Sequence, residues 1–337
     1  MIKRILHAVT WRIEKLIDRV ALRRNRRAVI DPYMGYATPE HLVVRGRVLT
    51  DLRRTNAKKG QSRWASFRQM VSLFATDEVA HVPVKAQGVT AQADEEGYFT
   101  LLMPRGPQKG WTNVAVGIDG QDGTTHCPVL IPPLEAECAV ISDIDDTMLV
   151  TGAYQLWRNL WTSMTGSVLT RRVYPDAVRF IRAISEDGRN PIYYVSSSPW
   201  NLHGFIAAIF DRAGLPRGPK FLRDLGVSET QFITGTHGDH KGSSIDVLLN
   251  ANPGLLYILV GDTGQHDAFV YRDAVERHKG RIGAVVLRTP GPGPDDKSLA
   301  AMKEIEAKGI PVLSGKTFDG FAEQLERSGP GPAALRG

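Results

Sequence analysis

Strands and helices are predicted to alternate along the second half of the chain, after Pro132-Pro133. Short apolar runs rich in β-branched residues are followed by stretches with helical spacing of apolar residues. The predicted strands are Ala139–Ser142, Ile192–Ser196, Leu255–Val260 and Ile282–Leu287, and the predicted helices are roughly Pro175–Glu186, Asn201–Arg212, Ser243–Asn250 and Asp267–His278. This alternation predicts an α/β fold with a doubly wound parallel sheet, whose functional site lies beyond the carboxyl ends of the strands.

The same domain is expected to continue past a Pro-Gly-rich link at Pro290–Pro294. A helix near Asp296–Lys308, a short strand at Ile310–Leu313 and a last helix around Phe318–Arg327 complete it. We place the domain at residues 135–328 and expect the Gly, Pro and Ala residues of 329–337 to form a disordered tail.

Residues 31–134 have a different pattern, with short alternating stretches separated by Gly, Asp and Pro. The predicted strands include His41–Leu49, Gln69–Phe74, Tyr98–Met103 and Asn113–Ile118. The spacing is typical of a small all-β sandwich domain. We interpret it as a structural or docking domain, and the sequence does not identify its protein partner.

The positive charge of the chain is concentrated at its N-terminus. The 337 residues have a net charge of +6, and residues 1–27 contain nine Lys and Arg against two acidic residues. Apolar residues recur there at helical spacing, so we predict a basic amphipathic helix over residues 1–30. Such a helix can bind an anionic membrane surface or pack on the rest of the protein, and the sequence does not decide between the two.

Cysteine content and hydropathy set the expected compartment. The two cysteines, Cys127 and Cys138, form neither a disulfide framework nor a metal-ligand pattern. The longest apolar runs are too short to cross a bilayer. We therefore expect a cytoplasmic protein, with peripheral attachment to the inner face of a membrane as the alternative. Nucleic-acid binding is not expected, because no aromatic-interleaved basic surface accompanies the Arg23–Arg27 stretch.

An acidic string follows the first predicted strand of the α/β region. Asp143, Asp145 and Thr147 form an Asp-x-Asp-x-Thr pattern at the carboxyl end of Ala139–Ser142. Carboxylates beside a buried strand are costly unless a cation holds them. Asp143 could attack a phosphorus atom if a metal offset the repulsion between anions, and Asp145 could exchange protons with the leaving group and with water. The alternative is a solvated acidic turn.

Further polar residues follow the later strands in order. Ser196 ends the second strand, Lys241 follows the polar loop Gly235–His240 and opens a helical segment, and Asp262 and Asp267 follow the third strand. A hydroxyl and an ammonium at these places can hold phosphoryl oxygens, and hard carboxylate oxygens suit Mg²⁺. Each feature alone is compatible with an ordinary turn or surface residue, but their order argues against coincidence.

The four motifs resemble those of the haloacid-dehalogenase-like phosphatases. Dehalogenases of that superfamily lack the second Asp, so Asp145 points to phosphoryl transfer. The resemblance implies Mg²⁺ held by Asp143, the backbone carbonyl of Asp145 and Asp262, with Asp267 in support. It also implies that Ser196 and Lys241 contact the phosphate.

Over about residues 137–290 the chain resembles more closely the catalytic domain of the actin-patch type of phosphatidate phosphatase. The matching strings are Asp-Ile-Asp-Asp-Thr from Asp143, Tyr-Val-Ser-Ser-Ser-Pro from Tyr194, Gly-Pro-Lys-Phe-Leu from Gly218 and Gly-Asp-Thr-Gly-Gln-His-Asp from Gly261. Two departures concern the substrate: the lipid phosphatases best known by this acidic string carry Gly in place of Asp146, and their partner domains differ. We further predict a catalytic role for Thr147 and substrate contacts for Ser197, Ser198 and His240.

The activity that the resemblance implies is Mg²⁺-dependent hydrolysis of phosphatidate to diacylglycerol and phosphate. Trp157 and Trp161 belong to an apolar stripe that could receive acyl chains or could simply pack on the core. A phosphatase for a soluble phosphomonoester or phosphoprotein is the first alternative. A non-catalytic scaffold that binds a membrane or a partner is the second.

Overall fold

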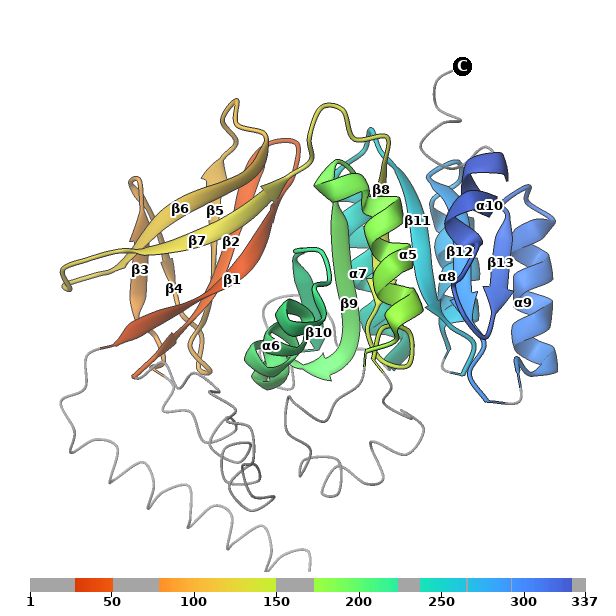
Figure 1. Cartoon of the computed structure of the whole chain (residues 1–337). Helices are drawn as coiled ribbons and strands as arrows, with labels where there is room; N and C mark the ends of the chain where they lie inside the picture. The colour runs from red at the N-terminus through yellow and green to blue at the C-terminus, as the bar shows by residue number, and fades with distance from the viewer. Residues whose placement is uncertain are drawn as a thin grey trace, which may run out of the picture.

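The structure is a computed structural model, which describes residues 28–50, 79–149, 173–223, 237–264, 266–291 and 293–328. Within these ranges the chain forms two sheets, one in each half of the sequence (Figure 1). Residues 1–27 of the helix predicted over residues 1–30, and the predicted strand Gln69–Phe74, lie outside the described residues. The predicted end of that helix is wrong, because Val29 and Ile30 begin a β-strand. No helix in the described ranges has the length and apolar character to cross a membrane.

The described residues of the N-terminal half fold into a β-module of seven strands. Its strands are β1 (Val29–Ala37), β2 (His41–Leu49), β3 (Pro83–Ala86), β4 (Val89–Gln92), β5 (Tyr98–Pro104), β6 (Gly110–Ile118) and β7 (Thr125–Ile131). Alternating burial of side chains explains why these segments form strands. Along β5, Phe99, Leu101 and Met103 are buried while their neighbours are more exposed. These side chains belong to an apolar core shared by the whole module.

The seven strands form one sheet in the order β4-β3-β6-β7-β1-β2-β5. Neighbours pair antiparallel, except β1 and β7, which run parallel. The outer strands β4 and β5 contact each other, so the sheet is nearly closed. The all-β prediction is confirmed, but the expected sandwich of two packed sheets is replaced by one curved sheet, because closure lets a single sheet enclose its core.

The C-terminal half is an α/β domain. Its strands are β8 (Cys138–Asp143), β9 (Ile192–Pro199), β10 (Lys220–Arg223), β11 (Leu256–Asp262), β12 (Ile282–Arg288) and β13 (Val312–Gly315). Its helices are α5 (Pro175–Ser185), α6 (His203–Ala213), α7 (His237–Ala251), α8 (Asp267–Arg277), α9 (Asp296–Glu306) and α10 (Phe321–Ser328), with short 3-10 turns η1 (Glu186–Gly188) and η2 (Trp200–Leu202). The parallel α/β prediction is confirmed, and β10 is an element that the sequence analysis did not assign.

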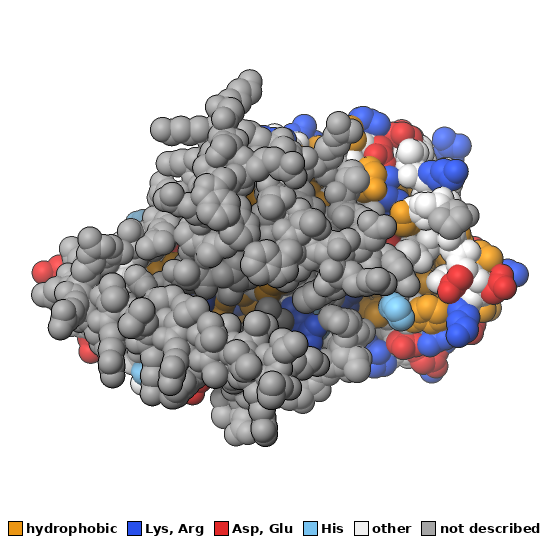
Figure 2. Space-filling view, turned by 90° about the horizontal axis from the view of Figure 1, so that it is seen from below, with side chains coloured by type: hydrophobic (Ala, Val, Ile, Leu, Met, Phe, Trp, Pro, Cys, Tyr) orange, Lys and Arg blue, Asp and Glu red, His pale blue; other side chains and the backbone are white. Residues whose placement is uncertain are grey.

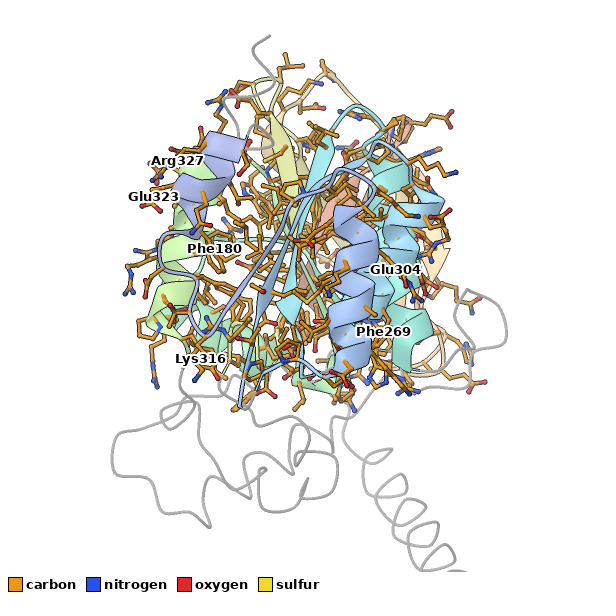
Figure 3. The ribbon with its side chains drawn as sticks, turned by 90° about the vertical axis from the view of Figure 1, so that its right-hand side faces the viewer. Phe180, Phe269, Glu304, Lys316, Glu323 and Arg327 are labelled. Carbon is orange, nitrogen blue, oxygen red and sulfur yellow. The ribbon has the colours of Figure 1, made fainter. Side chains whose placement is uncertain are left out.

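Six parallel strands pair in the order β10-β9-β8-β11-β12-β13. Figure 3 shows α5 and α10 on one face of this sheet, beside Phe180, and α8 and α9 on the other, beside Phe269. The chain runs outward from β8 to β10 and then returns to β11 on the other side of β8. The strand order therefore reverses between β8 and β11, and the carboxyl ends of these two strands form the switch point where α/β sheets place their ligands.

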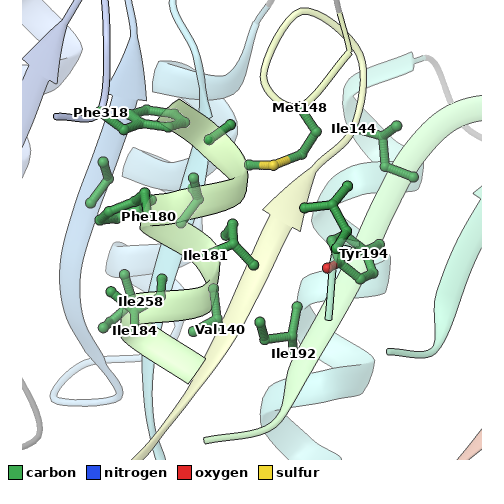
Figure 4. Close-up of a cluster of buried hydrophobic side chains, with 14 of the residues drawn as sticks. Val140, Ile144, Met148, Phe180, Ile181, Ile184, Ile192, Tyr194, Ile258 and Phe318 are labelled. Atoms are coloured by element: carbon green, nitrogen blue, oxygen red, sulfur yellow. The ribbon is translucent and has the colours of Figure 1, made fainter. Parts of the chain in front are cut away.

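Each face of the sheet is covered because its strands are apolar on both sides. On one face Phe180, Ile181 and Ile184 of α5 pack over Val140 and Ile258 (Figure 4). The spacing of these three residues puts them on one side of the helix. A second cluster from α7, α8 and α9 covers the opposite face. The helices on the two faces hold the strands in place, and the last residues of these strands form the site.

Candidate functional site at the carboxyl ends of the strands

The last residues of β8 and β11 bring two carboxylates together. Asp143 ends β8, Asp262 ends β11, and these strands are parallel neighbours in which Val260 pairs with Ser142. Asp267, the first residue of α8, adds a third carboxylate. One oxygen from each of the three lies within 4.8 Å of the others, and all three residues are buried. The predicted convergence of acids from two strands is thus observed.

The carboxylate of Asp267 packs closely against the backbone at the end of β11. The backbone N–H of Asp262 donates to Asp267 Oδ2 over 3.1 Å. A Cβ atom on Gly261 would lie 2.5 Å from that oxygen and 2.6 Å from the hydroxyl of Tyr271. The Tyr271 hydroxyl in turn donates to the carbonyl of Val260 over 2.8 Å. Glycine is therefore required at position 261 by close approach.

Lys241 places its ammonium among these acids. Its Nζ lies 2.7 Å from Asp143 Oδ1 and 2.5 Å from Asp267 Oδ1. The prediction that Lys241 opens a helix is wrong: α7 begins at His237, so Lys241 lies in its second turn, where the backbone N–H groups are used within the helix. Lys241 therefore contributes its ammonium group to the site, and not a free backbone N–H group.

The electrostatics of the pocket favour an added cation. Burial raises the pKa of Asp143 well above its ordinary value, the ammonium of Lys241 opposes that shift, and the nearby carboxylates, Asp267 first, add to it. Although Lys241 forms an ion pair with Asp143, neither Asp143 oxygen accepts a well-aligned hydrogen bond from the described residues. Three buried carboxylates around one ammonium leave excess negative charge, which fits the oxygen ligand set of Mg²⁺.

The loop after Asp143 folds back on itself. The carbonyl of Ile144 accepts hydrogen bonds from the N–H groups of Met148 and Leu149, each over 3.0 Å. Asp146 has a φ of 56°, in the left-handed region. Glycine, Asn and Asp adopt that region most readily, which explains how Asp can occupy position 146. Thr147 is fully buried beneath this turn.

Asp145 is not one of the three clustered acids, and its side chain contacts the end of β9. Its Oδ2 accepts hydrogen bonds from Ser196 Oγ over 2.7 Å and from Ser198 Oγ over 3.0 Å. The backbone N–H of Ser198 donates to Ser196 Oγ over 2.9 Å, which closes a small network. The Asp145 side chain is therefore separate from the candidate metal ligands, and a contact of its backbone carbonyl with a metal stays a prediction.

The remaining predicted residues are distributed differently. Ser197 is partly exposed between the two serines that bind Asp145. His240 is buried in α7 next to Lys241, and burial lowers its pKa. Trp157 and Trp161 lie outside the described residues. The catalytic and substrate-binding roles assigned to all these residues stay predictions.

Arg288 is a residue of the site that sequence reasoning missed. It ends β12, beside Asp262 in the register of the sheet, and it is 2% exposed. Its Nε donates to the carbonyl of Thr147 over 3.2 Å, and its Nη1 donates to the carbonyl of Lys316 over 2.8 Å. The sequence feature that could have identified Arg288 is its position directly after a predicted buried strand.

Figure 2 looks at the molecule from below, toward the carboxyl ends of the α/β strands. The described surface visible at the right of this view mixes Lys and Arg with Asp and Glu. The described part of this face thus has no single sign of charge, so the acidic character of the site comes from the buried cluster.

The fold and the buried acids define a three-layer α/β domain with a carboxylate-rich site at its topological switch point. Residues 138–289 match the family described as phosphatidate phosphatase APP1, catalytic domain. The resemblance seen in the sequence is thereby confirmed.

Two individual proteins give the extent of similarity. Phosphatidate phosphatase APP1 of Saccharomyces cerevisiae is 26% identical over 149 residues, which are 44% of this chain and 25% of the yeast protein. The chain thus matches about a quarter of the length of that relative. A crystal structure of a carbohydrate acetylesterase from Xanthomonas citri aligns over 86% of this chain and 68% of that one, with 10% identity and a TM-score of 0.29.

Proposed function

We propose that this chain hydrolyses phosphatidate to diacylglycerol and phosphate through a phosphorylated Asp143. The observation that carries the proposal is the arrangement around that residue. Asp143 is buried beside Asp262, Asp267 and the ammonium of Lys241, and Asp145 lies two residues further on. The match of residues 138–289 to the phosphatidate phosphatase APP1 catalytic domain supports the choice of substrate.

The acid cluster fits a divalent cation, for which Mg²⁺ is our proposal. Asp143, Asp262 and Asp267 would hold it, since their oxygens lie close together and are buried. The bound ion would neutralise negative charge on the phosphoryl group and on the attacking carboxylate. Lys241 adds a fixed positive charge on the same side of the site.

In the first step, a carboxylate oxygen of Asp143 attacks phosphorus and the bond between phosphorus and the ester oxygen breaks. The electron pair leaves with the diacylglycerol oxygen, which takes a proton from Asp145. In the second step, Asp145 accepts a proton from water as the water oxygen attacks phosphorus and the Asp143–phosphorus bond breaks. Phosphate leaves, and both carboxyl groups return to their starting forms.

An enzyme that hydrolyses phosphatidate must reach the membrane surface, so the proposal includes attachment to an anionic membrane. The basic segment 1–27 could supply it through electrostatic attraction to anionic lipid, worth roughly 1 kcal/mol for each Lys or Arg near the surface. Hydrolysis of phosphatidate in anionic vesicles should then weaken when Lys3, Arg4 and Arg12 are changed to Gln. The hydrolysis of soluble phosphates by the same variant should stay unchanged.

The test of the function is a substrate panel with and without Mg²⁺. The panel contains phosphatidate in vesicles, glycerol 3-phosphate and a phosphoserine peptide. It distinguishes a lipid phosphatase from a phosphatase for a soluble phosphomonoester or a phosphoprotein. Asp143→Asn should abolish turnover of every substrate, whereas Asp119→Asn, a change at an exposed ion pair of the β-module, should not. Equal turnover by Asp143→Asn and the unmodified chain would overturn the mechanism, and a preference for soluble phosphates would overturn the substrate.

A further inference from the structure

The β-module contacts the α/β domain at the residues directly after the three serines of β9. Tyr33 of β1 stacks on Trp200 of η2, with ring centroids 4.9 Å apart and ring planes 5° apart. His203, at the start of α6, lies 4.1 Å from the same Tyr33 ring. Because Tyr33 is 4% exposed, this contact is an internal part of the molecule.

Asn201 carries the polar part of the same contact. Its Oδ1 accepts hydrogen bonds from Tyr98 Oη over 3.1 Å and from Arg47 Nη1 over 3.3 Å. Arg47 is itself fixed, because its Nε donates to the carbonyl of Glu96 over 2.8 Å and its guanidinium lies 4.4 Å from the centre of the Tyr98 ring. Arg47 is 3% exposed, so these hydrogen bonds form with little competing water.

A second anchor holds the neighbouring strand. Arg45 of β2 donates from Nη2 to the carbonyl of Lys220 over 3.1 Å and to the carbonyl of Met34 over 2.8 Å. Its guanidinium lies 4.6 Å from the centre of the Phe221 ring. Lys220 and Phe221 belong to β10, which pairs with β9 through Tyr194 and Val195. The β-module therefore fixes β9 from the side as well as at its end.

The contact is close to Asp145 along the chain. Asn201 lies three residues after Ser198, and Ser198 and Ser196 both donate to Asp145 Oδ2. The intervening Pro199 has a fixed φ and limits the movement between them. A shift of Asn201 is thus passed to the two hydroxyl groups that hold Asp145.

We propose that Asn201, held by Tyr98 and Arg47 of the β-module, is a positioning residue for Asp145. The β-module is then part of the catalytic unit, a role beyond structural support or partner docking. The inference rests on the proposed function, in which Asp145 donates a proton to the leaving group. Proton donors act only within hydrogen-bond reach, and a displacement of about 1 Å can cost on the order of a hundredfold in rate.

The test compares two leaving groups in the full chain. Diacylglycerol leaves as a basic alkoxide that needs a proton, whereas nitrophenolate leaves from 4-nitrophenyl phosphate without one. For Asn201→Ala we expect the single-turnover rate of leaving-group release, which reports the first step alone, to fall about tenfold or more on phosphatidate and to change by less than about threefold on 4-nitrophenyl phosphate. A general loss of folded enzyme would lower both rates equally.

Three further variants separate positioning from packing. Tyr98→Phe, which removes one hydroxyl, should show the same selective loss in smaller degree, and Asn201→Asp, which keeps an oxygen acceptor, should retain most of the phosphatidate activity. Trp111→Leu removes another contact between the two halves, with Arg217 at 4.8 Å, and should leave the ratio of the two rates unchanged.

The outcomes are distinguishable. An unmodified chain that hydrolyses neither substrate overturns the proposed function and this inference with it. If the unmodified chain hydrolyses both, equal ratios in Asn201→Ala and Trp111→Leu overturn the inference alone. If it accepts only phosphatidate, the inference requires Asn201→Ala to lower kcat at unchanged KM and melting temperature, and a change in KM alone overturns it.

Discussion

Arg288 Nη2 donates to Asp176 Oδ2 over 2.6 Å, and the two side chains are only 2% and 9% exposed. The backbone N–H of Phe318 donates to the same oxygen over 2.9 Å. The guanidinium also lies between two rings, 4.0 Å from the centre of Tyr174 and 4.3 Å from that of Phe318. One buried ion pair thus joins the start of α5, the end of β12 and the segment before α10.

Loss of the Asp176 carboxylate should destabilise the fold strongly. In Asp176→Ala the guanidinium of Arg288 stays buried without its anion, and such changes cost about 3–5 kcal/mol. The matched control is Asp319→Ala, because the ion pair of Asp319 with Arg179 of α5 is largely exposed and its loss should change little. Urea unfolding of both variants measures the difference, and similar midpoints would contradict the prediction.

The contribution of Asp176 should depend on pH in a defined direction. Burial acts to raise the pKa of this carboxyl, but hydrogen bonds from Phe318 and Arg288 outweigh it and hold the pKa below its ordinary value. The ionised form is therefore favoured by folding, so its stabilisation is complete above the unfolded pKa of about 3.9 and is lost as pH falls through the lower folded pKa.

Thermal unfolding between pH 3 and pH 7 checks this dependence. The gap in melting temperature between the unmodified chain and Asp176→Asn should stay constant above about pH 5 and shrink below about pH 4. A gap that widened on acidification would show that the folded pKa is raised, contrary to the expectation.

Mg²⁺ should stabilise the folded chain through the acid cluster. A ligand that binds only the folded state at a hundred times its Kd adds about 2.7 kcal/mol. Asp262→Asn removes one of three clustered carboxylates and should abolish most of this stabilisation, whereas Asp119→Asn in the β-module should keep it. The measurement is melting temperature against Mg²⁺ concentration, and an equal rise in Asp262→Asn would exclude this cluster as the site.

Sequence reasoning located the central strands of the α/β domain well because they are continuous apolar runs. The predicted Ala139–Ser142 and Ile282–Leu287 lie within β8 and β12, each of which continues to a polar last residue. It missed β10, whose four residues begin with Lys220 and end with Arg223. Lys220 is buried, and its backbone carbonyl accepts a hydrogen bond from Arg45 in the other half of the chain, a long-range contact that a local pattern does not indicate.

The site shows the same division between local pattern and long-range contact. Asp143 and Asp262 could be predicted to meet because parallel neighbouring strands end at one edge of a sheet. The contacts of Arg288 with Thr147 and of Asn201 with Tyr98 join residues more than a hundred positions apart. The spacing of residues along the chain does not indicate such long-range pairs. Residues that act by positioning another side chain therefore could not be predicted from this sequence alone.

Gly261→Ala should remove activity without removing any functional group. The new Cβ would lie 2.5 Å from Asp267 Oδ2 and 2.6 Å from Tyr271 Oη, and both atoms are held by hydrogen bonds to the backbone of β11. Overpacking of this kind costs about 1–3 kcal/mol. Relief of the clash would displace the carboxylate of Asp267, so we expect weaker Mg²⁺ binding together with lower turnover.

Gly254→Ala is the matched control for that substitution, since Gly254 lies shortly before β11 and a Cβ there would meet nothing within 4 Å. It should bind Mg²⁺ and turn over substrate like the unmodified chain. The two glycines differ in what surrounds them, so the comparison isolates close packing against Asp267. If Gly261→Ala bound Mg²⁺ as tightly as Gly254→Ala, the position of Asp267 would not matter for the metal, and its place among the ligands would have to be given up.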